Sequence, residues 1–307
     1  MELNIFDETS VLESVVVGIA KSNGGVPNIK DVYDPKSRSH ILSGTYPKEV
    51  NMINELDSFV KLLTSYGVKV YRPKVIENYN QIYSRDIGFV IENKFLISNI
   101  LPIRSQEIKA IQYLLSSLPS NSIINFPDEA HIEGGDVILH KNKIYVGAYI
   151  KDDYSEFITA RTNIKGLEFL RKNFPNKEVV LLELNKSNFN PKKNILHLDC
   201  CFQPLGESYA IIHKEGFSNQ NQLQMLIDDF GFENCFFVDA NEMFDMMTNI
   251  FSINKSTVVS DPYFSRLNYW LVSKGFSVEE LSFREVSKQE GLFRCVTLPL
   301  KRKKWMD

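Results

Sequence analysis

Short apolar runs rich in β-branched and aromatic residues recur in pairs along the chain, and a polar turn separates the two runs of each pair. This pattern predicts β-hairpins. The predicted hairpins span residues 89–97, 137–146, 200–212 and 250–259. A further run at 293–300 has no partner after it, so the N-terminal run 14–20 is the strand expected to pair with it. The two ends of the chain would then close one sheet.

Segments with helical periodicity lie between these hairpins. Apolar side chains spaced three or four residues apart predict helices around 52–63, 108–118, 223–230 and 264–271. Ser105 is the expected N-cap of the second helix, and Asp261-Pro262 is the expected start of the fourth, with proline in its first turn. Short strands follow the helical segments, at residues 68–71, 178–182, 235–238 and 277–281.

A unit of hairpin, helix and strand therefore recurs about five times. We predict an α/β fold, a pseudo-fivefold α/β propeller of repeated hairpin-helix-strand modules around a central active-site channel. The alternative is an open doubly wound α/β sheet, which antiparallel hairpins fit poorly. No low-complexity tract or compositional break divides the sequence, so a single domain over residues 1–307 is expected.

Composition and charge exclude several classes of function. The 307 residues include 35 basic and 38 acidic side chains, a formal charge of −3, which gives no net attraction to nucleic acid or to an anionic membrane. The longest N-terminal apolar run, Val15–Ala20, is too short for a signal-peptide core or a membrane span. We therefore expect a cytoplasmic protein, and the basic run 301–304 is expected to be a solvated terminal face.

The four cysteines do not form a disulfide pattern. Cys200 and Cys201 are adjacent, and the sequence contains no C-x-x-C pair. Reduced thiols are therefore expected, so that each cysteine is either a packing residue or a nucleophile. Cys200 and Cys201 are interpreted as packing residues on opposite faces of a strand.

The propeller prediction brings a particular set of polar residues together. If every hairpin begins near the central axis, the residues at or just ahead of its start converge on one site. These are Arg85-Asp86, Glu133-Gly134-Gly135-Asp136, His197-Leu198-Asp199, Asn249 and Arg294-Cys295. A thiolate is a nucleophile, histidine can serve as acid and base, and several carboxylates around one cavity favour a cationic substrate.

Each of these residues also has a purely structural interpretation. Cys295 alone is typical of a packed strand residue, and His197 alone of a hydrogen-bonded core histidine. Arg85-Asp86 alone is consistent with a buried ion pair. A metal hydrolase using His197, Asp199, Cys200 and Glu133 is a further alternative, but no His pair at i, i+4 and no C-x-x-C supports it, so no metal is predicted.

Taken together, these motifs resemble the guanidino-group-modifying superfamily of arginine deiminases, dimethylarginine dimethylaminohydrolases and amidinotransferases. The resemblance rests on Ser84-Arg85-Asp86, Ile132–Asp136, Arg161-Thr162-Asn163, His197-Leu198-Asp199 and Gly291–Thr297, in family order. The stretches 14–18 and 68–73 are similar to the family's first module, so the resemblance covers nearly the whole chain. It implies a pseudo-fivefold α/β propeller.

The resemblance also implies a role for each matching residue. Cys295 matches the nucleophile that forms a covalent amidino-thioether, and His197 matches the general acid and base. Glu133 and Asp86 match carboxylates that bind the guanidinium, and Asp199 matches the second carboxylate of the His-x-Asp pair. Arg161 resembles an arginine that hydrolases of the family use for the substrate carboxylate. This chemistry requires no cofactor.

Motifs shared by hydrolases and transferases leave the second step open. Arg161 favours an arginine-like substrate and hydrolysis, while Asp199 and the N-terminal segment resemble the transferases equally well. The sequence therefore favours hydrolysis of arginine or an arginine derivative, with amidino transfer to an acceptor amine as the alternative. A non-catalytic binding module for cationic amino acids is an alternative of another class. The acceptor and the assembly state, including a homo-oligomer, are left open.

Overall fold

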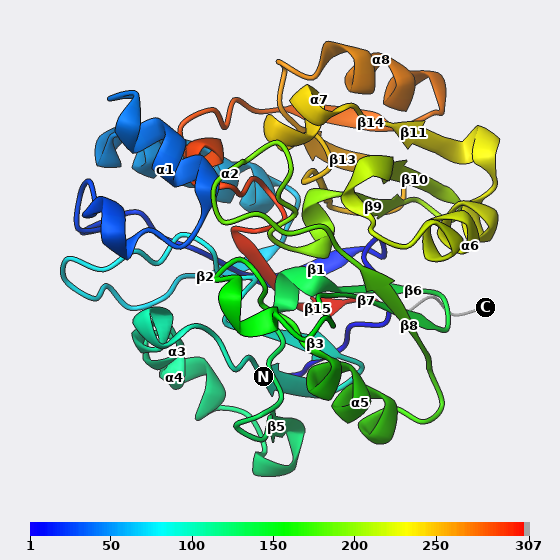
Figure 1. Cartoon of the computed structure of the whole chain (residues 1–307), viewed down its shortest axis with the longest axis horizontal. Helices are drawn as coiled ribbons and strands as arrows, with labels where there is room; N and C mark the ends of the chain where they lie inside the picture. Colours follow the sequence, from blue (N-terminus) through cyan, green and yellow to red (C-terminus); the bar gives the residue numbers. More distant parts are fainter. Residues whose placement is uncertain (304–307) are drawn as a thin grey trace.

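Five separate three-stranded sheets form the framework of the computed structural model, which describes residues 1–303 (Figure 1). Every sheet has the same topology: two antiparallel strands, and a third strand that pairs in parallel with one of them. A parallel neighbour requires a crossover connection rather than a tight turn. The repeated unit predicted from the hydrophobic pattern is therefore confirmed, within a mixed α/β fold.

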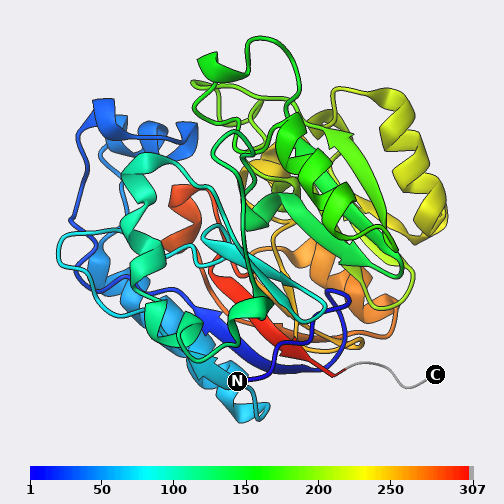
Figure 2. The same cartoon turned by 90° about the horizontal axis from the view of Figure 1, so that it is seen from below.

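The two ends of the chain share one sheet. Strand β1 (Leu12–Val17) pairs antiparallel with β15 (Thr297–Arg302) and parallel with β2 (Lys69–Tyr71). Figures 1 and 2 both show β1 and β15 side by side. The other sheets follow in chain order: β3 (Gly88–Ile91), β4 (Lys94–Ile97) and β5 (Ile123–Asn125); β6 (Val137–His140), β7 (Lys143–Ala148) and β8 (Glu178–Glu183); β9 (Phe202–Leu205), β10 (Tyr209–Ile212) and β11 (Cys235–Phe237); β12 (Phe251–Ser252), β13 (Thr257–Ser260) and β14 (Ser277–Glu280).

Helices make the crossovers and lie at the periphery of the molecule in Figure 1. The crossover helices are α2 (Glu49–Ser65), α3 (Gln106–Lys109), α4 (Gln112–Leu115), α5 (Ile164–Asn173), α6 (Gln220–Phe230) and α8 (Ser265–Ser273). Two further helices, α1 (Pro35–Leu42) and α7 (Ala240–Phe244), precede α2 and β12. None of the helices in residues 1–303 is both long and apolar enough to cross a membrane.

The apolar stripe of α2 behaves as its spacing predicts. Met52, Leu56, Phe59 and Leu63 are all fully buried. The Phe59 ring packs edge-on against aromatic rings from three distant segments: Phe251, Phe283 and Phe293. Burying each such side chain contributes about 1.5–3 kcal/mol. This cluster anchors α2, the helix of the first crossover, to the segment that carries Cys295.

Two predicted helix starts differ in the structure. Ser105 has the predicted N-cap position before α3, but it follows a 3₁₀ turn at Pro102–Arg104, its φ and ψ of −57° and −27° are already helical, and its side chain makes no capping hydrogen bond. The predicted helix 105–118 is two short helices. Helix α8 begins at Ser265 rather than at Pro262, because the Asp261 carboxylate accepts the backbone N–H groups of Tyr263 and Phe283 and holds a turn there.

The C-terminal strand also differs from its prediction. It begins at Thr297, and residues 293–296 form a turn, so Cys295 lies just before the strand rather than inside it. Arg302 is buried, donating to the carbonyl oxygens of Ser10 and Ser252, instead of lying on a solvated face. Lys301 is partly exposed and Lys303 is exposed, as predicted, whereas Lys304 lies outside the described residues.

Candidate active site

A cavity of about 210 Å³ is lined by three residues singled out from the sequence: Asp86, His197 and Cys295. Each precedes an edge strand that pairs antiparallel with the middle strand of its sheet: Asp86 lies ahead of β3, His197 ahead of β9 and Cys295 ahead of β15. Glu133 has the corresponding position ahead of β6 and contacts His197. The repeated topology therefore places side chains from equivalent positions of different sheets at or beside the same cavity.

Two glycines allow the close packing of these side chains. A Cβ on Gly135 would lie 2.7 Å from the His197 ring. A Cβ on Gly291 would lie 2.3 Å from the Tyr83 ring and 2.9 Å from Cys295 Cβ. These approaches are too close for any side chain, so glycine is required at both positions.

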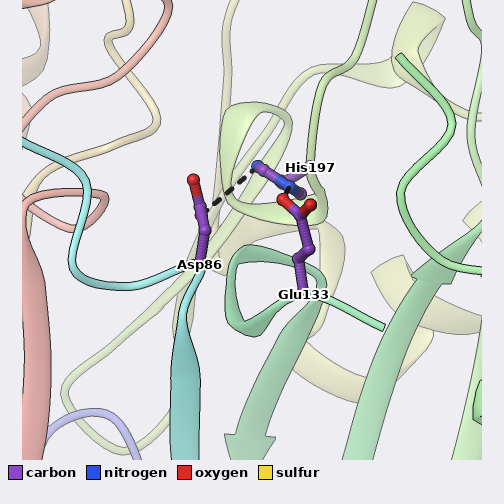
Figure 3. Close-up of side chains that lie close together, drawn as sticks. All are labelled: Asp86, Glu133 and His197. Atoms are coloured by element: carbon purple, nitrogen blue, oxygen red, sulfur yellow. Dashed lines mark hydrogen bonds and ion pairs between the residues drawn. The ribbon is translucent and has the colours of Figure 1, made fainter. Parts of the chain in front are cut away.

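His197 lies between two carboxylates, as Figure 3 shows. Its Nε2 is 2.8 Å from Glu133 Oε2, and its Nδ1 is 3.7 Å from Asp86 Oδ1. Burial lowers the pKa of His197, but the charges of Asp86, Glu133 and Asp136 outweigh burial and raise the pKa to about 9. The imidazole is therefore protonated at neutral pH and can donate a proton.

Glu133 is itself held by a buried arginine. Arg161 Nη1 lies 3.2 Å from Glu133 Oε2, and both side chains are almost completely buried. Burial raises the pKa of Glu133, but Arg161 and His197 outweigh it and lower the pKa to about 2. The rest of the Arg161 guanidinium donates to the carbonyl oxygens of Ile158 and Tyr33, and Arg161 does not line the cavity. A role for Arg161 in binding a substrate carboxylate stays a prediction.

The Cys295 thiol is 3% exposed and has two polar neighbours. Asn249 Nδ2 donates to Sγ at 3.2 Å, and Asp199 Oδ2 lies 3.6 Å from Sγ. Asn249 Oδ1 accepts the backbone N–H groups of Leu292 and Cys295, which fixes the amide with its NH₂ group toward sulfur. Burial, followed by Asp199 and Asp86, raises the pKa of Cys295 well above its usual value. The thiol is therefore protonated when no cation is near.

Asp199 lies behind the thiol rather than on the cavity wall. It is fully buried, and Arg294 Nη1 contacts its Oδ2 at 2.8 Å. Arg294 also pairs with Glu8 at 2.9 Å. Asp199 is thus bound by an arginine of the protein, and its predicted role in substrate binding is untested.

Five charged residues that line the cavity were not selected by the sequence analysis. Asp31 and Asp34 lie ahead of α1, Arg104 and Glu107 lie in the segment ahead of α4, and Glu290 lies in the loop before Cys295. Arg104 Nη1 contacts Asp86 Oδ2 at 2.7 Å, and its Nε contacts Glu107 Oε1 at 2.6 Å. None of these residues lies at the start of a predicted hairpin, and that position was the criterion by which the other candidates were selected from the sequence.

Asp86, Glu133 and His197 also form a potential metal-ligand set, since their donor atoms lie within 4.8 Å of one another. Each carboxylate, however, is already paired with a buried arginine, Arg104 on Asp86 and Arg161 on Glu133. A divalent ion at this place would lie next to two guanidinium groups. The charge balance therefore favours a hydrogen-bonded imidazolium over a metal site.

A family model described as N,N dimethylarginine dimethylhydrolase, eukaryotic, matches residues 43–302. The uncharacterised protein YkgA of Bacillus subtilis (strain 168) is 32% identical over 276 residues, which cover 89% of this chain and 88% of YkgA. Both matches extend over most of the chain, and the family-model match includes the segments around Asp86, Glu133, His197 and Cys295.

Solved structures with the same fold are less similar in sequence. SxtG, an amidinotransferase from Microseira wollei in saxitoxin biosynthesis, has a TM-score of 0.77 at 18% identity, over 99% of this chain and 98% of SxtG. The N-terminal domain of ArgZ, a cyanobacterial arginine dihydrolase, has a TM-score of 0.75 at 16% identity, over 94% and 97%. The inosamine-phosphate amidinotransferase of Streptomyces griseus has a TM-score of 0.75 at 17% identity, over 99% and 98%.

Proposed function

The chain belongs to the N,N dimethylarginine dimethylhydrolase family of the guanidino-group-modifying superfamily, and on this premise we propose that it cleaves a guanidino C–N bond through a covalent intermediate on Cys295. The substrate is arginine or an arginine derivative, and water resolves the intermediate. The observation that carries the proposal is that a thiol, an imidazolium and a carboxylate line one cavity: Cys295, His197 and Asp86.

Substrate binding activates the nucleophile. Burial and two nearby carboxylates raise the pKa of Cys295 in the empty cavity. A guanidinium bound against Asp86 brings a positive charge close to the sulfur, which lowers the thiol pKa and favours the thiolate. The Asn249 amide donates to Sγ and further stabilises the anion. The thiol proton leaves to solvent through the cavity that Cys295 lines.

The two chemical steps use His197 first as an acid and then as a base. Sγ attacks the guanidinium carbon, the carbon–nitrogen bond to the departing amine breaks, and the amine leaves with the proton of the imidazolium. The neutral imidazole then takes a proton from water as the water oxygen bonds to the amidino carbon. The carbon–sulfur bond breaks, which releases a ureido product and the thiolate. Glu133 holds the imidazole and stabilises its charged form throughout.

Amidino transfer is the second candidate, because the same intermediate serves both reactions and solved amidinotransferases share the fold. Incubation with arginine or methylated arginines, with and without acceptor amines, followed by mass spectrometry, separates the two. Citrulline indicates hydrolysis, and ornithine with a new guanidino compound indicates transfer. Binding without any product indicates the non-catalytic alternative.

The nucleophile is tested directly by Cys295→Ser. The variant is expected to lose turnover completely while its circular dichroism and melting temperature stay unchanged, and stoichiometric alkylation of the wild type is expected to map to Cys295. Alkylation of Cys200 or Cys201 instead, or full activity of the Ser variant, would refute the assignment.

The architecture belongs to the same proposal. The five sheets share one topology, and each has a candidate residue just ahead of the edge strand that is antiparallel to its middle strand. This repetition supports a pseudo-fivefold propeller and a single domain over residues 1–307. The four cysteines carry free thiols, which fits the cytoplasm. The proposed chemistry uses a small guanidino substrate and needs no cofactor.

A further inference from the structure

Arg294 directly precedes the nucleophile in the sequence and is fully buried. A neighbouring arginine ordinarily lowers the pKa of a cysteine and makes it reactive. The pKa of Cys295 is instead raised well above its usual value, by burial and then by Asp199 and Asp86, while Arg294 acts in the opposite direction. The groups that take up the charge of Arg294 therefore decide how reactive the thiol is in the empty site.

Two carboxylates share the Arg294 guanidinium. Arg294 Nη1 donates at 2.8 Å to Asp199 Oδ2, the oxygen that lies 3.6 Å from Cys295 Sγ. On its other edge, Arg294 Nη2 donates to Glu8 Oε1 at 2.9 Å and Nε donates to Glu8 Oε2 at 3.3 Å. Glu8 thus makes the bidentate contact, which is the stronger arrangement for a guanidinium and a carboxylate.

Glu8 lies outside every segment considered so far for the site. It precedes β1, it is not among residues 43–302 that the family model matches, and it does not line the cavity. Its side chain is 6% exposed. Burial raises the pKa of Glu8, but the charges of Arg294 and Arg85 outweigh burial and lower the pKa to about 2. Glu8 is therefore ionised at neutral pH.

The backbone that carries Glu8 is fixed on both sides. The Asn4 N–H donates to the Leu300 carbonyl oxygen at 3.1 Å, and Thr9 Oγ1 donates to the Gly206 carbonyl oxygen at 2.8 Å. These contacts bind the N-terminal segment to β15 and to the turn after β9. The fold therefore holds the Glu8 carboxylate in place against Arg294.

The charges around Arg294 are balanced. Arg85 lies beside it and donates to the Arg294 carbonyl oxygen and to Thr297 Oγ1, both at 3.4 Å. Two buried cations and two buried anions thus lie together: Arg85, Arg294, Glu8 and Asp199. The next charges outward, Arg302 and Asp7, again have opposite signs. Cys295 therefore has no surplus of positive charge behind it.

We propose that Glu8 is a positioning residue that takes up the charge of Arg294, so that the Cys295 thiol stays protonated until a cationic substrate binds. This inference rests on the proposed role of Cys295 as the nucleophile and adds the control of its ionisation. Without the charge of Glu8, a net positive charge would lie behind the sulfur and favour the thiolate. The empty enzyme would then present a thiolate to alkylating agents and oxidants.

The other groups around the sulfur leave this role to Glu8. Asp86 lies on the cavity wall, where the substrate cation is proposed to bind, and Asn249 is neutral. Further titratable residues near the sulfur or on the cavity wall are Tyr83, His197, Cys200 and Glu290. None of these residues contacts Glu8, so a changed thiol pKa in a Glu8 variant reports on the charge of Glu8.

The test measures the thiol pKa of the full chain from the pH dependence of alkylation by iodoacetamide without substrate. Mass spectrometry distinguishes Cys295 from the other three cysteines. Glu8→Gln keeps the size of the side chain and an acceptor for Arg294 but removes the charge. We expect the thiol pKa to fall by about 1, the effect of one nearby buried charge. Alkylation at pH 7 should be about three- to tenfold faster, because the larger thiolate fraction is partly offset by lower nucleophilicity.

Arg85→Gln gives a test of opposite sign. It removes a positive charge from the same group of side chains, so the thiol pKa should rise and alkylation at pH 7 should slow. Disruption of the fold would instead expose the thiol to water and lower its pKa in both single variants. Glu8→Gln/Arg85→Gln restores the charge balance and should return the thiol pKa close to that of the wild type.

The outcomes are decisive for each variant. A thiol pKa in Glu8→Gln equal to or above that of the wild type refutes the inference. If Glu8→Gln does not fold, the double variant is compared with Arg85→Gln: a lower thiol pKa in the double variant supports the inference, and an equal or higher one refutes it. Glu2→Gln is the matched control, because it removes an exposed carboxylate of the same segment, paired with Lys301, and should leave the alkylation profile unchanged.

Failure of the proposed function has a different signature. If the wild type converts no guanidine compound, guanidino cleavage is wrong, but the alkylation profiles require no turnover and still decide the role of Glu8. Conversely, an unchanged profile in Glu8→Gln, in a chain whose wild type converts arginine or a methylated arginine, overturns the role of Glu8 and leaves the proposed function standing.

Discussion

Glu133→Gln removes the charge that keeps His197 protonated while leaving a side chain of the same size. Glu133 Oε2 is 2.8 Å from His197 Nε2 and 3.2 Å from Arg161 Nη1. A hydrogen bond to a charged group contributes about 1.5–3 kcal/mol, which corresponds to about 1–2 pKa units for His197. We therefore expect the pKa of His197 to fall from about 9 by that amount.

The change should be visible in activity and in stability. The alkaline limb of the kcat profile, where the imidazolium acid is lost, should move to lower pH by the same interval. In the wild type, the raised pKa of His197 stabilises the fold fully below its unfolded value of 6.5, and this stabilisation is lost as pH rises through about 9. Glu133→Gln should therefore lose more unfolding free energy at pH 6 than at pH 10, in addition to the cost of leaving Arg161 without its carboxylate.

NMR titration of the imidazole resonances measures the pKa, and urea denaturation at the two pH values measures the stability. Glu129→Gln is the matched control, because it makes the same chemical change at an exposed position and should alter neither quantity. If the pKa of His197 in Glu133→Gln equals that of the wild type, Glu133 does not stabilise the protonated imidazole. The role proposed for Glu133, to keep the general acid His197 charged, would then be wrong.

Asn249→Ala removes the amide donor to Cys295 Sγ and the acceptor for two backbone N–H groups. We expect kcat to fall on the order of 10–100-fold and alkylation of the thiol to require a higher pH. An unchanged pH profile of alkylation would show that the Asn249 amide does not stabilise the thiolate. Gly135→Ala places a methyl group 2.7 Å from the His197 ring, so turnover and melting temperature should both fall; steady-state kinetics and calorimetry test this. Phe59→Ala empties the core position among three aromatic rings and should cost about 3–5 kcal/mol of unfolding free energy by urea denaturation, and a cost below about 1 kcal/mol would contradict the packing.

Local patterns determined the repeating framework. Alternation of apolar residues with polar turns predicted the hairpins, and the stripe of Met52, Leu56, Phe59 and Leu63 predicted a helix that buries those side chains. The same reasoning failed where a residue's neighbours in space decide its conformation. Asp261 holds a turn because it accepts the N–H of Phe283, 22 residues away, and no local pattern could predict that partner.

For the site, the sequence determined which residues stand at the start of each hairpin, because a repeated fold brings equivalent positions together. Only the tertiary structure decided which of them face the cavity. Asp86, His197 and Cys295 do, while Arg161 and Asp199 are bound to Glu133 and Arg294 instead. The tertiary structure also added Asp31, Asp34, Arg104, Glu107 and Glu290. The physical reason is that burial makes ionised groups pair with whichever opposite charge the fold places beside them. Hydrophobic periodicity is a local property of the chain, whereas charge pairing is a property of the folded molecule.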